Sequence, residues 1–160
     1  EENKYADLDQ LQFLERIDTI LLGRKTYELF ADFWPGATTD KELIADQLNG
    51  TRKIVFSNTL SKAPWGNWPE AEIASGEAVD AVKKLKLLPG KDMVLWGSIS
   101  VAQALMKENL IDEYRMQLCP VLTGGGRSFF SREMTATKMD LIECKKYDTG
   151  RLFLNYAIKK

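Results

Sequence analysis

Apolar residues follow a helical period in some stretches of the chain and form short continuous runs in others. A period of three to four residues predicts amphipathic helices, and short β-favouring runs predict buried strands. The two kinds of segment alternate, which is typical of an α/β domain with a largely parallel sheet. The predicted helices cover residues 6–16, 24–33, 40–50, 78–89 and 100–108, and the predicted strands cover residues 19–22, 53–57, 71–74, 92–96, 114–118, 139–147 and 151–158.

Three details of this pattern decide the expected architecture. Asp40 is the predicted N-cap of the third helix, which places Leu43, Ile44 and Leu48 on one face. Residues 148–150, Asp-Thr-Gly, predict a hairpin turn between the last two strands. An antiparallel edge on a mostly parallel sheet is common. We therefore expect a single domain over residues 1–160, with three α/β/α layers and one mixed, mostly parallel sheet.

Composition places the chain among ordinary globular proteins. Of its 160 residues, 44% are hydrophobic and 28% are charged, with 22 Lys+Arg against 23 Asp+Glu and a net charge of -1. This balance gives no basic surface for a nucleic acid or an anionic membrane. No apolar run approaches the roughly 20 residues that a membrane helix needs.

The chain contains no histidine, which removes Ser-His-Asp triads, Cys-His dyads and histidine-ligated zinc together. Two cysteines, Cys119 and Cys144, cannot form a zinc site alone, so no metal site is expected. Both stand in apolar stretches and are predicted to be buried free thiols, in keeping with a reducing cytoplasm.

Three glycine-marked junctions are the candidate sites for chemistry. Residues 23–26 (Gly-Arg-Lys-Thr) and residues 97–99 (Gly-Ser-Ile) lie at predicted strand-to-helix turns, where unpaired backbone N–H groups attract anions. Residues 123–126 (Thr-Gly-Gly-Gly) form a loop that permits close approach of a ligand. A plain helix start, a tight turn and a mobile surface loop explain the same three patterns equally well.

The familiar nucleotide fingerprints are absent, because neither GxGxxG nor GxxxxGK[ST] occurs. Any nucleotide must therefore bind through another arrangement. Ser57 and Asn58 follow a predicted strand, at the position where ligands bind in open α/β sheets, although they also suit a simple turn.

Taken in order, these pieces resemble the dihydrofolate reductase superfamily. They are most similar to the reductase domain of the bifunctional riboflavin-biosynthesis enzyme (the RibD C-terminal domain) and its stand-alone relatives. A tryptophan, Trp96, replaces the first glycine of the Gly-Gly pair found in folate reductases, which also favours that branch. The similar segments are residues 22–28, 54–60, 94–98, 110–114 and 120–126, followed by Phe129-Phe130.

The resemblance implies NADPH as the cofactor. Arg24, Lys25 and Thr26 would bind its phosphates together with Ser57 and Asn58, and would select NADPH over NADH. Gly23, which precedes Arg24, would belong to the same phosphate-binding site. Further along the chain, the expected cofactor contacts are Gly97, Ser98 and Ile99 at the pyrophosphate and Thr123, Gly124, Gly125 and Gly126 near the other end of the cofactor.

The resemblance also implies two features near the start of the chain. Folate reductases carry a helix carboxylate that assists protonation, and Asp7, sixteen positions before Gly23, stands near that place. An acid in a first helical turn is also favourable for the helix alone. Family members further begin with a central strand that the sequence does not contain, so we expect an additional N-terminal strand, without which ladders would be unpaired beside residues 19–22.

The expected activity is hydride transfer from NADPH to a C=N-type carbon of a pyrimidine-like or pterin-like substrate. The first candidate is 5-amino-6-(5-phosphoribosylamino)uracil, from riboflavin biosynthesis, and the second is dihydrofolate. Without histidine, the proton would come from water or from a carboxylate such as Asp7. A non-catalytic NADPH-binding module and a globular domain with fortuitous glycine turns are the alternatives. A homodimer through residues 139–147 and 151–158 is the expected assembly.

Overall fold

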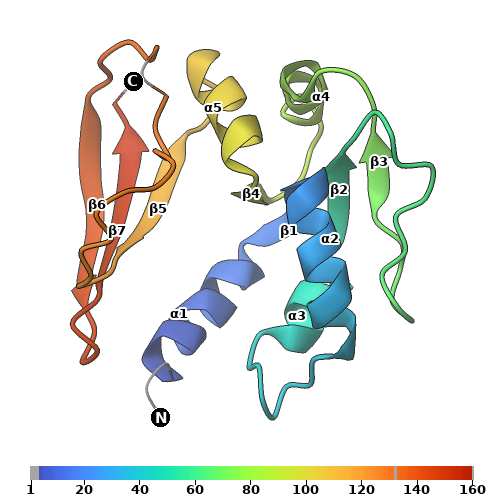
Figure 1. Cartoon of the computed structure of the whole chain (residues 1–160), viewed down its shortest axis with the longest axis horizontal. Coiled ribbons are helices and arrows are strands. Elements are labelled where there is room, and N and C mark those ends of the chain that lie inside the picture. Colours follow the sequence, from blue (N-terminus) through green and yellow to red (C-terminus); the bar gives the residue numbers. More distant parts are fainter. Residues whose placement is uncertain (1–3, 132, 160) are drawn as a thin grey trace.

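The computed structural model describes residues 4–131 and 133–159, and its helices flank two separate groups of strands (Figure 1). The order along the chain is α1 (Lys4–Glu15), β1 (Ile17–Gly23), α2 (Arg24–Phe33), the short 3-10 helix η1 (Trp34–Gly36), α3 (Ala45–Gly50), β2 (Arg52–Phe56), β3 (Glu72–Ala74), α4 (Ala78–Leu85), β4 (Asp92–Gly97), α5 (Ile99–Lys107), β5 (Glu113–Leu118), β6 (Met139–Lys146) and β7 (Leu152–Ile158).

The first four strands form a parallel sheet in the order β3-β2-β1-β4. Successive side chains of a strand point to opposite faces, so each strand supplies two cores. Ile20 and Leu22 of β1 pack with α1, α2 and α3, whereas Leu21 packs with α4 and α5 on the other face. The predicted three-layer arrangement is therefore confirmed for this sheet.

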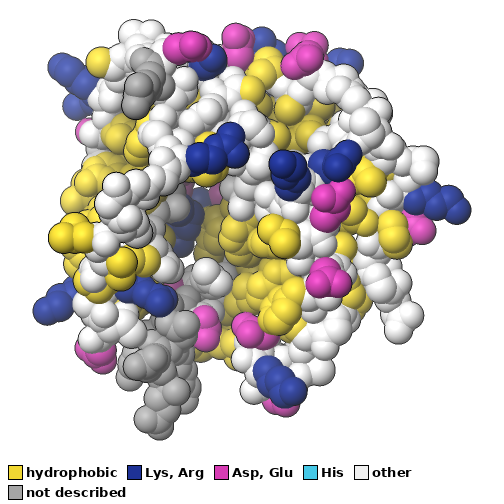
Figure 2. Space-filling view, viewed as in Figure 1, with side chains coloured by type: hydrophobic (Ala, Val, Ile, Leu, Met, Phe, Trp, Pro, Cys, Tyr) yellow, Lys and Arg dark blue, Asp and Glu magenta, His cyan; other side chains and the backbone are white. Residues whose placement is uncertain are grey.

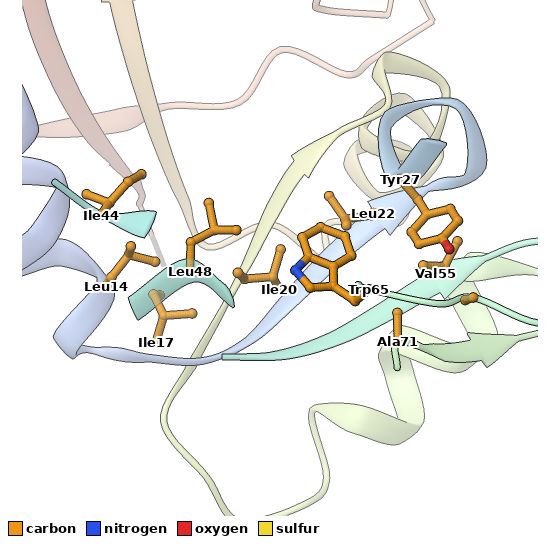
Figure 3. Close-up of a cluster of buried hydrophobic side chains, with 11 residues drawn as sticks. Leu14, Ile17, Ile20, Leu22, Tyr27, Ile44, Leu48, Val55, Trp65 and Ala71 are labelled. Carbon is orange, nitrogen blue, oxygen red and sulfur yellow. The ribbon is translucent and has the colours of Figure 1, made fainter. Parts of the chain in front are cut away.

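The core between the sheet and α2 is built around Trp65, which is fully buried (Figure 3). Its indole Nε1 donates a hydrogen bond of 2.7 Å to Oδ1 of the buried Asn49. The Asn49 amide in turn donates to the carbonyl of Trp34 at 2.7 Å. Tyr27 packs beside the indole, with ring centroids 6.1 Å apart. The loop that carries Trp65 is thus fastened to three separate elements.

Lys53 is the one buried cation of this core among the residues that the structure describes. Its Nζ donates to the carbonyls of Asn49 and Thr51, at 2.7 and 2.6 Å, and lies 4.6 Å from the Trp65 ring centroid. Burial lowers the pKa of Lys53 from 10.5 to about 8. Desolvation therefore outweighs these favourable contacts.

The free energy of unfolding is expected to rise between pH 8 and pH 9.5. In this window the folded state releases the Lys53 proton while the unfolded state keeps it, so the unfolded state binds more protons. The gain is about 1.5 kcal/mol, and below pH 8 the burial cost is fully present. Urea titrations at several pH values measure this slope. Lys53→Met should flatten it, and an unchanged slope in that variant would contradict the assignment.

The last three strands form an antiparallel sheet of their own, in the order β5-β7-β6. The predicted hairpin turn is confirmed, because the Tyr147 N–H donates to the Arg151 carbonyl at 2.9 Å. The strands were expected in one mixed sheet, and this detail is wrong. In the described residues no ladder joins β4 to β5, so the parallel and antiparallel parts remain two sheets.

The open strand edges also lie elsewhere than expected. β1 is paired on both sides, with β2 and with β4, so no unpaired ladder borders residues 19–22. Within the described ranges, β4 pairs only with β1, and β5 pairs only with β7. The edge strands are therefore β3 and β4 in the first sheet and β5 and β6 in the second, and β4 and β5 are the two that border the gap between the sheets. The additional N-terminal strand stays a prediction.

Two further expectations were wrong. Asp40 is no N-cap, because α3 begins only at Ala45, after a turn in which Ile44 becomes buried. Cys119 and Cys144 are free as expected but exposed rather than buried, since Cys119 follows the end of β5 and Cys144 lies on the edge strand β6.

Two observations bear on surroundings and assembly. No helix in the described part of the chain is long and apolar enough to cross a membrane. The edge strand β6 exposes Leu141 and Ile142, which lie in the segment of the expected homodimer contact. That contact stays a prediction.

Candidate functional site

The carboxyl ends of three parallel strands meet at one edge of the first sheet. Gly23 at the end of β1 pairs in register with Phe56 of β2, and Leu22 pairs with Gly97 of β4. The residues that follow these strands therefore converge, as ligand-binding groups do in open α/β sheets. Two of the three glycine junctions from the sequence lie here, together with Ser57.

The two junctions of this edge interlock through glycines. A Cβ atom added to Gly23 would lie 2.5 Å from Oγ of Ser98. A Cβ atom added to Gly97 would lie 2.8 Å from Oγ1 of Thr26, and Gly97 has a φ of +143°, which side chains rarely adopt. Each glycine thus admits a side chain from the opposite junction, and we call residues 23–26 with residues 97–99 the glycine cradle.

The helices that begin at the cradle have open N-termini. Neither α2 nor α5 has a side-chain cap, and neither has an acidic residue in its first turn. Arg24 and Lys25 are exposed at the start of α2. Arg24 already pairs with Glu28 at 3.0 Å, so the unpaired N–H groups, the helix dipoles and Lys25 are the features that favour an anion at this edge.

The loop after β2 is tied to the cradle by Arg24, whose Nη1 donates to Oγ1 of Thr59 at 2.8 Å. Ser57 is buried, and its Oγ accepts the backbone N–H groups of Thr59 and Leu60 at 3.2 and 3.1 Å. Asn58 Oδ1 accepts the N–H of Gly76 at 2.6 Å. Ser57 and Asn58 thus hold the shape of this loop.

The third glycine segment stands apart from the cradle. Thr123, Gly124 and Gly125 lie in an exposed loop after β5, where Thr123 Oγ1 donates to the Gly125 carbonyl at 3.0 Å. No described atom would lie within 4 Å of a Cβ added at Gly124, Gly125 or Gly126. The structure brings the first two junctions together and leaves this one open.

A cleft of about 880 Å³ runs between β4 and β5, and Figure 2 shows the hollow between the two parts of the molecule. Trp96, Gly97, Ser98 and Ile99 line one end of it, so the cleft opens beside the cradle. Trp96 also contacts Phe30 of α2, with ring centroids 6.2 Å apart.

The α1 side of the cleft carries an acid that sequence reasoning missed. Asp9 lies on the cleft wall and accepts hydrogen bonds from Lys145 Nζ at 2.9 Å and from the Tyr147 hydroxyl at 2.8 Å. Burial opposes ionisation of Asp9, but these hydrogen bonds outweigh it and lower the pKa of its carboxyl. Burial and the bond to Asp9 raise the pKa of Tyr147 to about 12. Near neutral pH, Asp9 is therefore a carboxylate and Tyr147 is a neutral phenol.

Asp7, the predicted proton donor, lies in the first turn of α1 and is not part of the cleft wall. Its catalytic role stays a prediction. The sequence carries a weak signal for Asp9, which is the second acid of the same helix. No group of three or more acidic or cysteine side chains suited to a metal ion occurs in the described part of the chain.

Comparison with known families and sequences gives consistent matches. The model of the family described as the RibD C-terminal domain matches residues 1–153. The uncharacterized protein YyaP of Bacillus subtilis (strain 168) is 29% identical over 153 residues, which cover 94% of this chain and 79% of that protein. The uncharacterized protein YwjB of the same organism is 25% identical over 146 residues, which cover 91% and 74%.

Two solved structures share the fold. One is a putative riboflavin biosynthesis protein from Shewanella sp. PV-4, with a TM-score of 0.72 and 23% identity, covering 100% of this chain and 81% of that one. The other is a pyrimidine reductase-like protein from Corynebacterium diphtheriae, with a TM-score of 0.65 and 16% identity, covering 97% and 81%. At these identities the likeness concerns the fold alone.

Proposed function

The chain belongs to the RibD C-terminal domain family, a family of reductases, and on that premise we propose that it is an NADPH-dependent reductase. Its proposed substrate is a pyrimidine of the 5-amino-6-(5-phosphoribosylamino)uracil type. The observation that carries the proposal is the glycine cradle, in which two open helix N-termini lie against each other beside a cleft.

The residues of the cradle fit a dinucleotide diphosphate. Because Gly23 and Gly97 carry no Cβ, Ser98 and Thr26 pack against them and the two helix starts lie close together. Backbone N–H groups of α2 and α5 would hold the diphosphate there, and Arg24 and Lys25 would pair with the 2′-phosphate. Ser57, on the neighbouring loop, would contribute to the 2′-phosphate. NADPH, when bound, supplies the hydride.

The cleft would position the substrate ring and surround it with groups of fixed protonation state. Its apolar wall beside Trp96 suits the flat ring of a heterocycle, because an aromatic side chain favours stacking with a flat ring. The lowered pKa of Asp9 keeps its carboxyl ionised, and Tyr147, with a pKa of about 12, stays protonated near neutral pH. This pair therefore does not release a proton near pH 7. Solvent entering the cleft is therefore the proposed proton source.

Arg24→Ala and Ser57→Ala are each expected to weaken NADPH binding about 10- to 100-fold, because a hydrogen bond to a charged group is worth about 1.5–3 kcal/mol. NADH, which lacks the 2′-phosphate, should lose much less affinity. Tryptophan quenching during titration with each cofactor measures both constants, with Trp96 as the expected reporter.

Lys83→Ala is the matched control, because Lys83 lies in α4 outside the cleft wall, paired with Glu108 at 3.1 Å. It should leave both affinities unchanged. Equal losses for NADPH and NADH in the Arg24 variant would refute selection through the 2′-phosphate. Failure of the unaltered protein to bind either cofactor would refute the reductase.

Turnover separates the remaining candidates. Oxidation of NADPH with the phosphoribosylaminouracil supports the proposed substrate, and oxidation with dihydrofolate would assign the folate reaction instead. Saturable NADPH binding without oxidation in the presence of either compound would identify a non-catalytic binding module.

A further inference from the structure

Arg115 lies in the middle of β5 and has no part in the cradle. Its guanidinium carbon lies 4.0 Å from the ring centroid of Phe13 in α1 and 4.6 Å from that of Phe153 in β7. Arg115, Phe13 and Phe153 all belong to the wall of the cleft. Two aromatic rings thus contact a half-buried cation at the substrate end of the proposed site.

The N–H groups of the Arg115 guanidinium are available for a ligand. In the described part of the chain it forms neither a hydrogen bond nor an ion pair. The carboxylates that attract Arg115 electrostatically are Glu143, Glu113 and Asp9. Each has its own ion pair: Glu143 with Lys145 at 3.0 Å, Glu113 with Arg16 at 3.8 Å and Asp9 with Lys145 at 2.9 Å. Burial lowers the pKa of Arg115, which reflects a desolvated charge. A cation that is desolvated and unpaired is costly unless an anion joins it.

The neighbouring strand shows the same surplus of hydrogen-bonding capacity. Asn155 of β7 stands directly opposite Arg115 in the ladder and is buried. Its amide donates to Glu113 at 3.3 Å, whereas its Oδ1 has no partner among the described residues. This face of the antiparallel sheet therefore holds both donors and an acceptor that the protein itself leaves unused.

The chemistry of Arg115 identifies a class of ligand. A guanidinium presents its N–H groups in a planar fork that matches a carboxylate or phosphate, and aromatic rings that lie against the fork hold it in place. We propose that Arg115 binds the phosphate monoester of the substrate and thereby orients its ring toward the cradle. This inference rests on the proposed function, which supplies a substrate with such a phosphate.

Binding of ribose 5-phosphate, compared with ribose, tests the site without any turnover. Calorimetry should show binding of the phosphate to the unaltered chain and a loss of at least 10-fold in Arg115→Met, which keeps the contact with the two rings. Arg115→Lys should retain part of the affinity, because it keeps the charge and loses the fork. Lys62→Met, which removes an exposed cation outside the cleft, should change nothing.

Kinetics then distinguish positioning from general damage. Arg115→Met should raise KM for the phosphorylated aminouracil about 10- to 100-fold with little change in kcat, and should leave the dephosphorylated compound unaffected. Equal losses for both compounds, or equal affinity of the unaltered chain for ribose and ribose 5-phosphate, would overturn the inference.

The two proposals fail separately. Titration with NADPH measures cofactor binding at the cradle, and titration with ribose 5-phosphate measures phosphate binding at Arg115. Arg115-dependent phosphate binding without NADPH binding would refute the reductase and keep the phosphate site. NADPH binding with a phosphate affinity that Arg115→Met leaves intact would keep the reductase and refute the role of Arg115.

Discussion

Gly97→Ala is expected to weaken NADPH binding at least 100-fold, or by about 2.7 kcal/mol or more. Gly97 has a φ of +143°, and its added Cβ would lie 2.8 Å from Thr26 Oγ1. Relief of this collision must move the start of α5 or the start of α2, and both supply N–H groups to the cradle. Fluorescence titration of the variant with NADPH measures the loss.

The matched control is Gly36→Ala, because a Cβ at Gly36 would meet nothing within 4 Å and its backbone is unstrained. That variant should bind NADPH like the unaltered chain. Urea unfolding of both variants shows whether the fold persists. Normal NADPH affinity in a folded Gly97→Ala protein would mean that the cradle is not the cofactor site.

Trp65→Ala is expected to reduce the free energy of unfolding by about 3–5 kcal/mol, the range typical of large aromatic side chains removed from cores. The indole is fully buried, fills the space beside Tyr27 and donates to Asn49. Its loss leaves a cavity and a buried amide oxygen without its donor, and an unpaired buried polar atom adds to the cost. Urea denaturation followed by circular dichroism measures the change.

Two variants separate these contributions. Trp65→Phe keeps most of the packing and loses the hydrogen bond, so it should cost about 1–3 kcal/mol. Trp68→Ala, in the same loop but only half-buried, should cost less than Trp65→Ala. If Trp65→Ala cost no more than Trp68→Ala, the loop would not be anchored through Trp65.

The sequence predicted the elements well where glycine or proline marks the ends of an element. Helix α2 occupies residues 24–33 as predicted, because Gly23 opens it and Pro35-Gly36 follow its end. The predicted N-cap at Asp40 was wrong because the start of α3 depends on tertiary packing, in which Ile44 and Leu48 become buried. The cysteines were misplaced because an apolar run does not tell which face of an edge strand is covered.

The site was predictable only as far as it depends on strand ends. Gly23 and Gly97 could be found because a glycine at a strand-to-helix turn is a local signal. Their mutual contact, however, depends on β1 and β4 being neighbours, which no local pattern states. Asp9 and Arg115 were missed for a similar reason, since their importance arises from α1 packing against the antiparallel sheet.

The free edges of β4 and β5 have a consequence for the mechanics of the molecule. No backbone ladder crosses from one sheet to the other in the described residues, so the two sheets are joined by α5, which connects β4 to β5, and by side-chain contacts. Amide protons along these two inner edges are expected to exchange with solvent more readily than those of β1, which is paired on both sides. A strand seated between β4 and β5 would pair with both edges at once and join the two sheets into one continuous sheet.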